Sequence, residues 1–214
     1  MSEGSADDSL LFSYLSLRKS IGVLGIALPF ALVFGERIIF GIGLRGSISA
    51  YYHTGMRDVF VGTLCVIGVF LFSYKGYGRA DNVAGNLACI FAIGVALFPT
   101  TREGATQGHE HVVGIVHLSC ALLFFCALIY FSLVLFTKGS PSPTARKVQR
   151  NRVYRICGYV MAGCIAAMVV LFALPDSVTS PLDPAGPVFW LESIAVVSFG
   201  ISWLTKGEAI LKDR

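Results

Sequence analysis

The chain of 214 residues is 55% hydrophobic and only 14% charged, and it carries a formal net charge of +4. Ordinary soluble domains are about 45–50% apolar and about 25% charged, so this composition excludes a nucleic-acid-binding module, a disordered chain and a water-soluble enzyme. The predicted fold class is all-α: a polytopic bundle of transmembrane helices in which residues 1–214 form a single transmembrane domain.

Six apolar segments follow one another along the chain, and each is a candidate membrane span. The first covers about residues 20–40 and contains Pro29. The others lie at about 58–74, 84–99, 112–136, 156–174 and 187–205. Because a helix needs about 20 residues to cross about 30 Å of hydrocarbon, the shorter segments are expected to extend by a turn into their flanking residues. We therefore predict six spans.

The basic residues are distributed unevenly between the two sides that six spans would define. If the N-terminus lies inside, the outer segments hold only four of the 17 basic residues, namely Arg37, Arg45, Arg57 and Arg102. An excess of Lys and Arg marks the cytoplasmic side of a membrane protein. Both termini are therefore predicted to be cytoplasmic.

The connection between the fourth and fifth segments is the most basic part of the chain. Between residues 138 and 155 it contains no acidic residue and six basic ones: Lys138, Arg146, Lys147, Arg150, Arg152 and Arg155. We interpret them as ordinary determinants of topology, with binding to the headgroups of anionic lipids as the alternative. Membrane lipids are thus the expected partners, and nucleic acid is not expected.

Glycines recur inside the apolar segments. They are Gly62, Gly68, Gly94, Gly114, Gly158 and Gly163. Small residues allow helix backbones to approach closely in a membrane. These glycines are expected to support packing within one copy or between copies, which leaves a homo-oligomer open.

The predicted topology gathers polar residues from three distant parts of the sequence at the outer side of the membrane. All four histidines of the chain belong to this outer layer. Its members include Ser49, His53 and Asp58, then His109, Glu110, His111 and His117, and finally Asp176, Asp183 and Glu192. His117 and Glu192 lie inside apolar segments, where ionisable groups are expensive and by default mark a functional site.

Two kinds of chemistry fit this outer layer. Imidazole and carboxylate ligands suit Zn²⁺ with an open position for an activated water. The candidate ligands are His53, His117 and either His111 or His109, with Asp58 or Glu192 as a further ligand or general base. The alternative is structural: a buried acid and a buried histidine would form hydrogen bonds that hold helices together.

Three stretches of the sequence resemble segments of small six-helix bacterial inner-membrane proteins whose activity is not established. They are SISAYYHTGMRDVFVG, VHLSCALLFF and FGISWLTKG. This resemblance implies a multi-pass protein of the bacterial inner membrane and supplies no chemistry.

A second resemblance is to the CREST superfamily of alkaline ceramidases and adiponectin-type receptors, which are membrane hydrolases with a zinc site. Ser49-x-x-x-His53 matches the first element of that site, and Asp58 is similar to its acid. The later His-x-x-x-His pair of that superfamily is missing here, and six spans replace seven. The resemblance implies Ser49 and Asp58 as catalytic candidates and zinc as the cofactor; Glu192 is the third catalytic candidate because it is an ionisable group inside an apolar segment.

Three functions stay open at this stage. The first is a metal-dependent hydrolase that acts on a lipid or amphiphile from the outer leaflet. The second is a transporter or channel in which His117 and Glu192 relay protons or bind substrate. The third is a non-catalytic membrane protein or sensor that binds a ligand or another protein.

Overall fold

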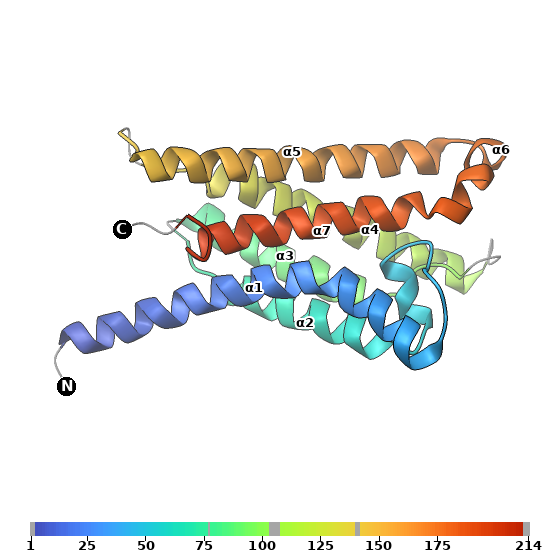
Figure 1. Ribbon diagram of the computed structural model, residues 1–214, viewed down its shortest axis with the longest axis horizontal. Coiled ribbons are helices and arrows are strands. Elements are labelled where there is room, and N and C mark those ends of the chain that lie inside the picture. The colour runs from blue at the N-terminus through green and yellow to red at the C-terminus, as the bar shows by residue number, and fades with distance from the viewer. Residues whose placement is uncertain (1–2, 77, 103–107, 140–141, 212–214) are drawn as a thin grey trace.

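The computed structural model describes residues 3–76, 78–102, 108–139 and 142–211, and these residues are helical or irregular, with no strand among them. The predicted all-α class is therefore confirmed for the described part of the chain. Figure 1 shows six long helices that run along one axis. The elements in chain order are α1 (Glu3–Phe40), η1 (Ser49–His53), α2 (Arg57–Ser73), α3 (Arg79–Leu97), α4 (His109–Tyr130), η2 (Phe131–Leu135), α5 (Ala145–Ala173), α6 (Asp176–Thr179), η3 (Ser180–Ala185) and α7 (Pro187–Lys206).

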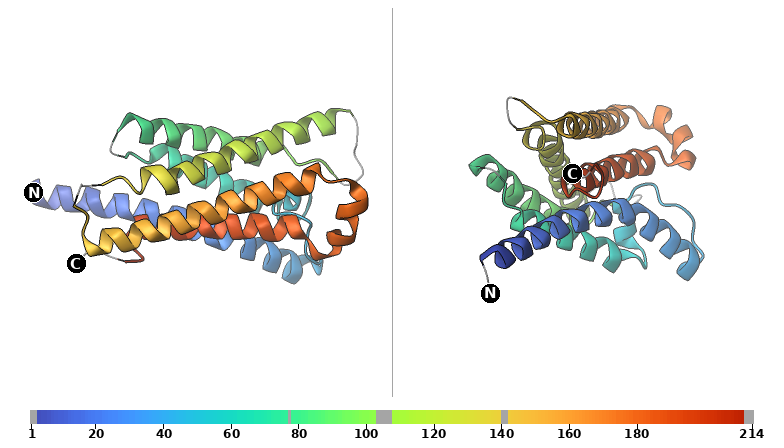
Figure 2. Two further views of the ribbon diagram at one scale, coloured as in Figure 1. Left: turned by 90° about the horizontal axis from the view of Figure 1, so that it is seen from above. Right: turned by 60° about the vertical axis from the view of Figure 1, so that its left-hand side comes forward.

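The six long helices close into a ring. Each packs mainly against two neighbours, in the order α1, α2, α3, α4, α5, α7 and back to α1. The two further views in Figure 2 show the same arrangement from above and obliquely from one end. The first part of α1 extends beyond the other helices at the end where the C-terminal tail also lies (Figure 1). The ring thus has two ends, and successive long helices run between them.

Five of these helices are long and apolar enough to cross a membrane. They contain the candidate spans Tyr14–Phe40, Arg79–Leu97, His109–Leu135, Ala145–Ala173 and Pro187–Lys206. The predicted sixth segment, residues 58–74, corresponds to α2, which has 17 residues. At a rise of about 1.5 Å per residue, α2 is about 26 Å long, slightly less than a typical hydrocarbon core. The five helices support a multi-pass membrane protein, and a sixth span stays a prediction.

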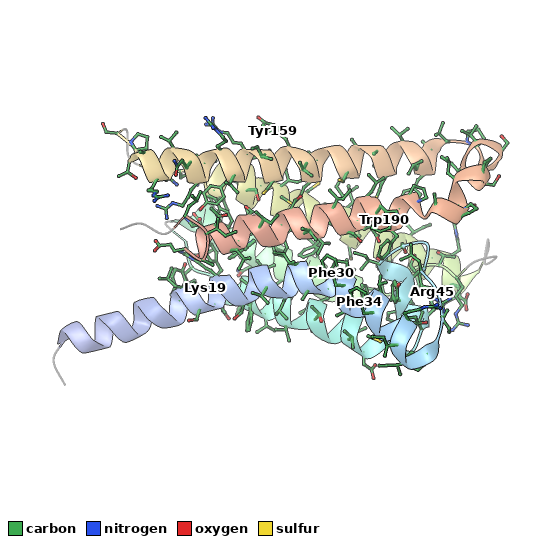
Figure 3. All side chains as sticks on the ribbon, in the orientation of Figure 1. Lys19, Phe30, Phe34, Arg45, Tyr159 and Trp190 are labelled. Carbon is green, nitrogen blue, oxygen red and sulfur yellow. The ribbon has the colours of Figure 1, made fainter. Side chains whose placement is uncertain are left out.

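The outer surface of the ring is apolar. Phe30, Phe34, Tyr159 and Trp190 are each more than half exposed, and Figure 3 shows them on the outside of α1, α5 and α7. A water-soluble protein rarely exposes contiguous apolar surface of this extent. Lipid chains would cover these side chains, so the surface agrees with the apolar spans.

An aromatic cluster fills the ring near its cytoplasmic end, as defined by the predicted topology. Trp203 of α7 is fully buried, and its ring centroid lies 5.1 Å from those of Tyr74 and Phe136 and 5.5 Å from that of Phe131. A buried hydrogen bond of 2.9 Å joins the hydroxyls of Ser132 and Ser202 at the same level. These contacts connect α7 with the end of α4 and with the residue that follows α2, which explains why the ring is tightly closed here.

The helices α1 and α7 touch through their backbones. A Cβ atom added to Gly200 would lie 2.6 Å from the carbonyl oxygen of Gly22, and one added to Gly22 would lie 2.8 Å from the carbonyl oxygen of Gly200. Close contacts of this kind need glycine on both helices. Among the glycines that the sequence suggested for packing, Gly94, Gly114 and Gly158 meet a neighbouring side chain. Gly62 and Gly163 face open space instead.

Helix α5 begins earlier than the apolar segment that predicted it. Thr144 caps its first turn, because the hydroxyl oxygen accepts a hydrogen bond of 3.1 Å from the backbone N–H of Lys147. The basic residues after Thr144 therefore belong to the helix rather than to a loop. They extend α5 beyond the apolar segment at its cytoplasmic end.

Candidate functional site

The predicted outer residues come together at one end of the ring. They lie on η1, at the starts of α2, α4 and α7, and in the segment after α3. Arg45, which lies in the connection after α1, and Trp190 are labelled near this end in Figure 3. The predicted residue Asp176 has a side chain outside those that the structure describes.

The carboxylate of Glu192, on α7, forms hydrogen bonds with the segment that leads into η1. Its Oε2 atom accepts a hydrogen bond of 2.5 Å from the backbone N–H of Ile48, and the backbone N–H and hydroxyl of Ser49 also bond to this carboxylate. One turn earlier, the N–H of Phe189 donates to the carbonyl oxygen of Gly46 at 3.0 Å. The structure therefore brings Ser49 and Glu192 together, and the carboxylate satisfies N–H groups that would otherwise lack an acceptor at the start of η1.

His53 bonds to the protein through both ring nitrogens. Its Nε2 lies 2.7 Å from the carbonyl oxygen of Thr100, and its Nδ1 accepts a hydrogen bond of 3.3 Å from Nε of Arg102. A carbonyl oxygen only accepts and an arginine only donates, so in this arrangement Nε2 of His53 is the donor and Nδ1 the acceptor. The lone pair on Nδ1, which a metal would need, faces the Arg102 guanidinium.

His117 forms a similar bond from within α4. This side chain is 3% exposed, and its Nδ1 donates a hydrogen bond of 2.6 Å to the carbonyl oxygen of Phe98. Phe98 follows α3 directly and precedes Pro99, which ends the helix, so the carbonyl has no partner further along a helix. His53 and His117 thus bind carbonyls on either side of Pro99 and hold this segment against η1 and α4.

A buried ion pair closes the connection between α1 and η1. Arg45 Nη2 lies 2.9 Å from Oε1 of Glu36, whose side chain is 1% exposed. Beside this pair, burial raises the pKa of Tyr51 above its ordinary value, and the negative charge of Glu36 acts in the same direction. The sequence did not identify Arg45 as the partner of Glu36, since the two are nine positions apart across an irregular segment.

The remaining predicted residues are not assembled into a ligand set. Asp58 is exposed at the start of α2, and His109, Glu110 and His111 are exposed at the start of α4. Among the residues that the structure describes, no three His, Cys, Asp or Glu side chains lie close enough to hold a metal ion. His111 and His117 are six residues apart, so their side chains point about 120° apart around α4 and do not share a face. The zinc set of His53, His117 and His111 with Asp58 is therefore not supported.

Loss of the Glu192 carboxylate is expected to destabilise the outer end of the ring. Glu192→Ala leaves the N–H of Ile48 without an acceptor, which should lower the free energy of unfolding by about 1–2 kcal/mol. Glu192→Gln keeps an acceptor oxygen and should lose less. Unfolding of both variants in mixed detergent micelles measures the difference. Equal losses would mean that the hydrogen bond to Ile48 contributes little.

A cavity of about 630 Å³ lies at the other end of the ring, the end that the predicted topology assigns to the cytoplasm. We call it the basic pocket. It is lined by Arg18, Lys138, Gly139, Ser142, Pro143, Thr144, Lys147, Arg150, Tyr154, Lys206 and Glu208. Among the described residues of the lining, five side chains are basic and one is acidic. Figure 3 shows blue nitrogen atoms gathered at this end, near the start of α5.

Contacts with the aromatic cluster and with backbone carbonyls hold the cations of the basic pocket in place. The Arg18 guanidinium lies 4.1 Å from the centroid of the Tyr14 ring and donates to the carbonyl oxygen of Lys206 at 3.4 Å. Nζ of Lys147 donates to the carbonyl oxygen of Phe136 at 2.8 Å. The pocket is therefore built by α1, α5, α7 and the connection before α5, and the sequence indicated only its α4–α5 part.

No family model, curated protein or solved structure matches this chain. The molecule is characterised by its own features. These are a ring of helices with an apolar outer surface, a fastened polar layer at one end and a basic pocket at the other. Its five long apolar helices support an integral, multi-pass membrane protein.

Proposed function

We propose that the protein is a ligand-binding membrane protein, with six spans and both termini in the cytoplasm, that binds a small anion at its cytoplasmic end without transforming it. This is the third of the functions that the sequence left open. The resemblance of its segments to bacterial inner-membrane proteins favours that membrane as its location. The apolar outer surface and the bias of basic residues toward one side support the architecture.

The basic pocket is the observation that carries the proposal. Side chains from the first and last long helices and from the α4–α5 connection converge on one cavity, and positive charges exceed negative ones there by five to one. Topology alone requires basic residues on the cytoplasmic side, but it does not require them to line one cavity. A concave site with converging charged groups is typical of ligand binding.

The outer layer supports a structural role at the opposite end. Glu192 bonds to the N–H of Ile48, and His53 and His117 bond to the carbonyls of Thr100 and Phe98. Each of these groups fastens an irregular segment to a helix. A hydrolase at the outer face would need these side chains for its own chemistry. Here they form hydrogen bonds with the backbone instead.

A metal-dependent hydrolase is the second candidate, and one contact favours it. The hydroxyl of Ser49 bonds to the Glu192 carboxylate, so a nucleophile lies beside a base. Stoichiometric zinc in the purified protein that is lost in His117→Ala would favour this candidate over the first. Under our proposal we expect no stoichiometric zinc in the purified protein and no change of its zinc content in His117→Ala, because the imidazoles of His53 and His117 already bond to the backbone.

Multivalent anions are expected to stabilise the purified protein. At constant ionic strength, replacing chloride with citrate or phosphate should raise the unfolding temperature, because a ligand that binds only the folded state adds to its stability. Arg150→Gln, which removes one positive charge from the basic pocket, should reduce the rise. If neither these anions nor an anionic lipid stabilises the protein more than chloride does, the proposed function is wrong.

The topology makes an independent prediction about accessibility in intact cells. Val148 and Ala185 are both exposed, at the start of α5 and in η3. Ala185→Cys should react with a membrane-impermeant thiol reagent added outside, whereas Val148→Cys should react only after the membrane is permeabilised. The wild-type chain, whose six cysteines lie in apolar segments, is the control. Reaction of both positions from outside would contradict six spans with cytoplasmic termini.

A further inference from the structure

We propose that the ligand of the basic pocket is an organic phosphate, which is a phosphate group joined to a larger organic part; this inference rests on the proposed anion-binding function. The phosphate could come from the headgroup of an anionic lipid or from a soluble phosphate ester, since both present the same group to the protein. The argument uses the charge of the pocket, its hydrogen-bond donors, its size and its depth.

The charge of the pocket indicates a ligand with more than one negative charge or several anionic oxygens. Five basic side chains line one cavity, and Glu208 is the acidic side chain among the described residues of its lining; Asp81 also acts electrostatically on Lys206. Glu208 lies 3.6 Å from Arg150, so its charge faces one part of the cluster only. Like charges held near each other at a protein surface repel by a few kcal/mol or less, and a bound anion removes that cost.

The donors of the pocket match the oxygens of a phosphate. Arg18 and Arg150 place guanidinium groups in the lining beside the lysines, and planar guanidinium groups suit phosphate oxygens. Arg18 also donates to the carbonyl oxygen of Lys206, and Arg150 lies 3.6 Å from Glu208. Thr144 and Tyr154 supply hydroxyls in the lining. Thr144 is also the residue before the first turn of α5, so the N-terminal end of this long helix opens beside the cavity. Helix N-termini favour phosphate because their N–H groups and dipole point toward it.

The size of the pocket indicates that the phosphate carries an organic part. About 630 Å³ is available, whereas a water molecule occupies about 30 Å³ in the liquid and an isolated phosphate would leave most of the space unfilled. Cavities of about 300–1,000 Å³ are typical for organic ligands. Pro143 and Gly139 contribute uncharged lining next to the cations.

The depth of the pocket is compatible with a lipid as the source of the phosphate. Arg18 lies near the start of the candidate span Tyr14–Phe40, and Lys206 is the last residue of the candidate span Pro187–Lys206. Lipid phosphates lie just outside the hydrocarbon, at the same level as the ends of spans. A soluble phosphate ester would reach the same cations from the cytoplasm.

The experiment measures thermal unfolding of the full-length protein in nanodiscs of phosphatidylcholine. In one arm glycerol phosphate is added at constant ionic strength, and in the other the nanodiscs contain phosphatidylglycerol. We expect stabilisation in at least one arm, and binding at least tenfold weaker in Arg150→Gln, as for loss of a charged hydrogen bond. Lys138→Gln, at an exposed loop position that cannot disturb the packing, should weaken binding several-fold.

Two further variants make the test specific to the pocket. Glu208→Gln removes its only acid and should tighten binding, since the charge of the cavity becomes more positive. Arg152→Gln removes the same charge from an exposed position of α5 outside the lining and should leave binding unchanged. Equal weakening in Arg152→Gln and Lys138→Gln would overturn the proposal, because the effect would then reflect surface charge alone.

The arms also separate this inference from the proposed function. Stabilisation by phosphatidylglycerol only identifies a lipid phosphate, and stabilisation by glycerol phosphate only identifies a soluble ester; both outcomes support the inference. If neither acts but citrate stabilises the protein in a manner that needs Arg150 and Lys138, the organic phosphate is overturned while anion binding stands. If no anion acts, both the inference and the proposed function fail.

Discussion

Replacing Trp203 with alanine is expected to lower the free energy of unfolding by about 3–5 kcal/mol, the range for loss of a large aromatic side chain from a packed interior. Trp203 is fully buried and contacts the rings of Tyr74, which follows α2, and of Phe131 and Phe136, which lie in and directly after η2. Lipid cannot enter the space that the indole leaves. The surrounding rings would lose their dispersion contacts without compensation.

The second tryptophan provides a matched control. Trp190 lies on the same helix, is 54% exposed and faces outward at the other end of α7 (Figure 3). Trp190→Ala should change stability by about 0.5 kcal/mol or less, as is usual for exposed positions. Unfolding of both variants by sodium dodecyl sulfate in mixed micelles gives the comparison. Similar losses for the two variants would show that the aromatic cluster is not a packed interior.

A substitution at the contact between α1 and α7 should lower the free energy of unfolding nearly as much as Trp203→Ala. Gly200→Val is expected to cost about 3 kcal/mol, at the upper end of the range for overpacking. Its Cβ would lie 2.6 Å from the carbonyl oxygen of Gly22, and backbone cannot move aside as a flexible side chain does. The two helices would have to separate, which also disturbs the Arg18 and Lys206 side of the basic pocket.

Gly62→Val is the matched control, because it introduces the same side chain at a position without a neighbouring atom. A Cβ at this position of α2 meets no atom within 4 Å, so Gly62→Val should fold with nearly unchanged stability. The measurement is the unfolding midpoint in the same micelles, with the helical content followed by circular dichroism. A loss at Gly62 that equals the loss at Gly200 would indicate that the valine itself, rather than the contact between α1 and α7, is responsible. An unaffected Gly200→Val would show that α1 and α7 do not touch as described.

The outer layer illustrates how much of a site a topology prediction can supply. The alternation of spans correctly placed Ser49, His53, His117 and Glu192 at one end of the ring, because the direction of each helix follows from the order of the segments. It did not predict that the imidazoles bind the carbonyls beside Pro99. That depends on the direction in which each side chain points from its helix, and a rotation of about 100° per residue decides it.

The sequence likewise did not predict which glycines lie at contacts between helices. Gly22 and Gly200 form a close backbone contact between two helices, whereas Gly62 and Gly163 face outward. All four lie in apolar segments in which nearly every side chain is apolar, so hydrophobicity does not distinguish the inner face from the outer face. Only the arrangement of the neighbours shows which glycines are necessary.

The sequence by itself determined the helical class, the positions of the apolar segments and the uneven distribution of basic residues. These are local or additive properties, since composition and run length decide whether a segment is stable in lipid. The tertiary structure alone decided which polar groups meet. It joined Arg18, Lys206 and the start of α5 into one pocket, and it brought His53 and His117 to the carbonyls of Thr100 and Phe98. The physical reason is that ligand binding depends on distances between residues far apart in the chain, and those distances are set by helix rotation and packing.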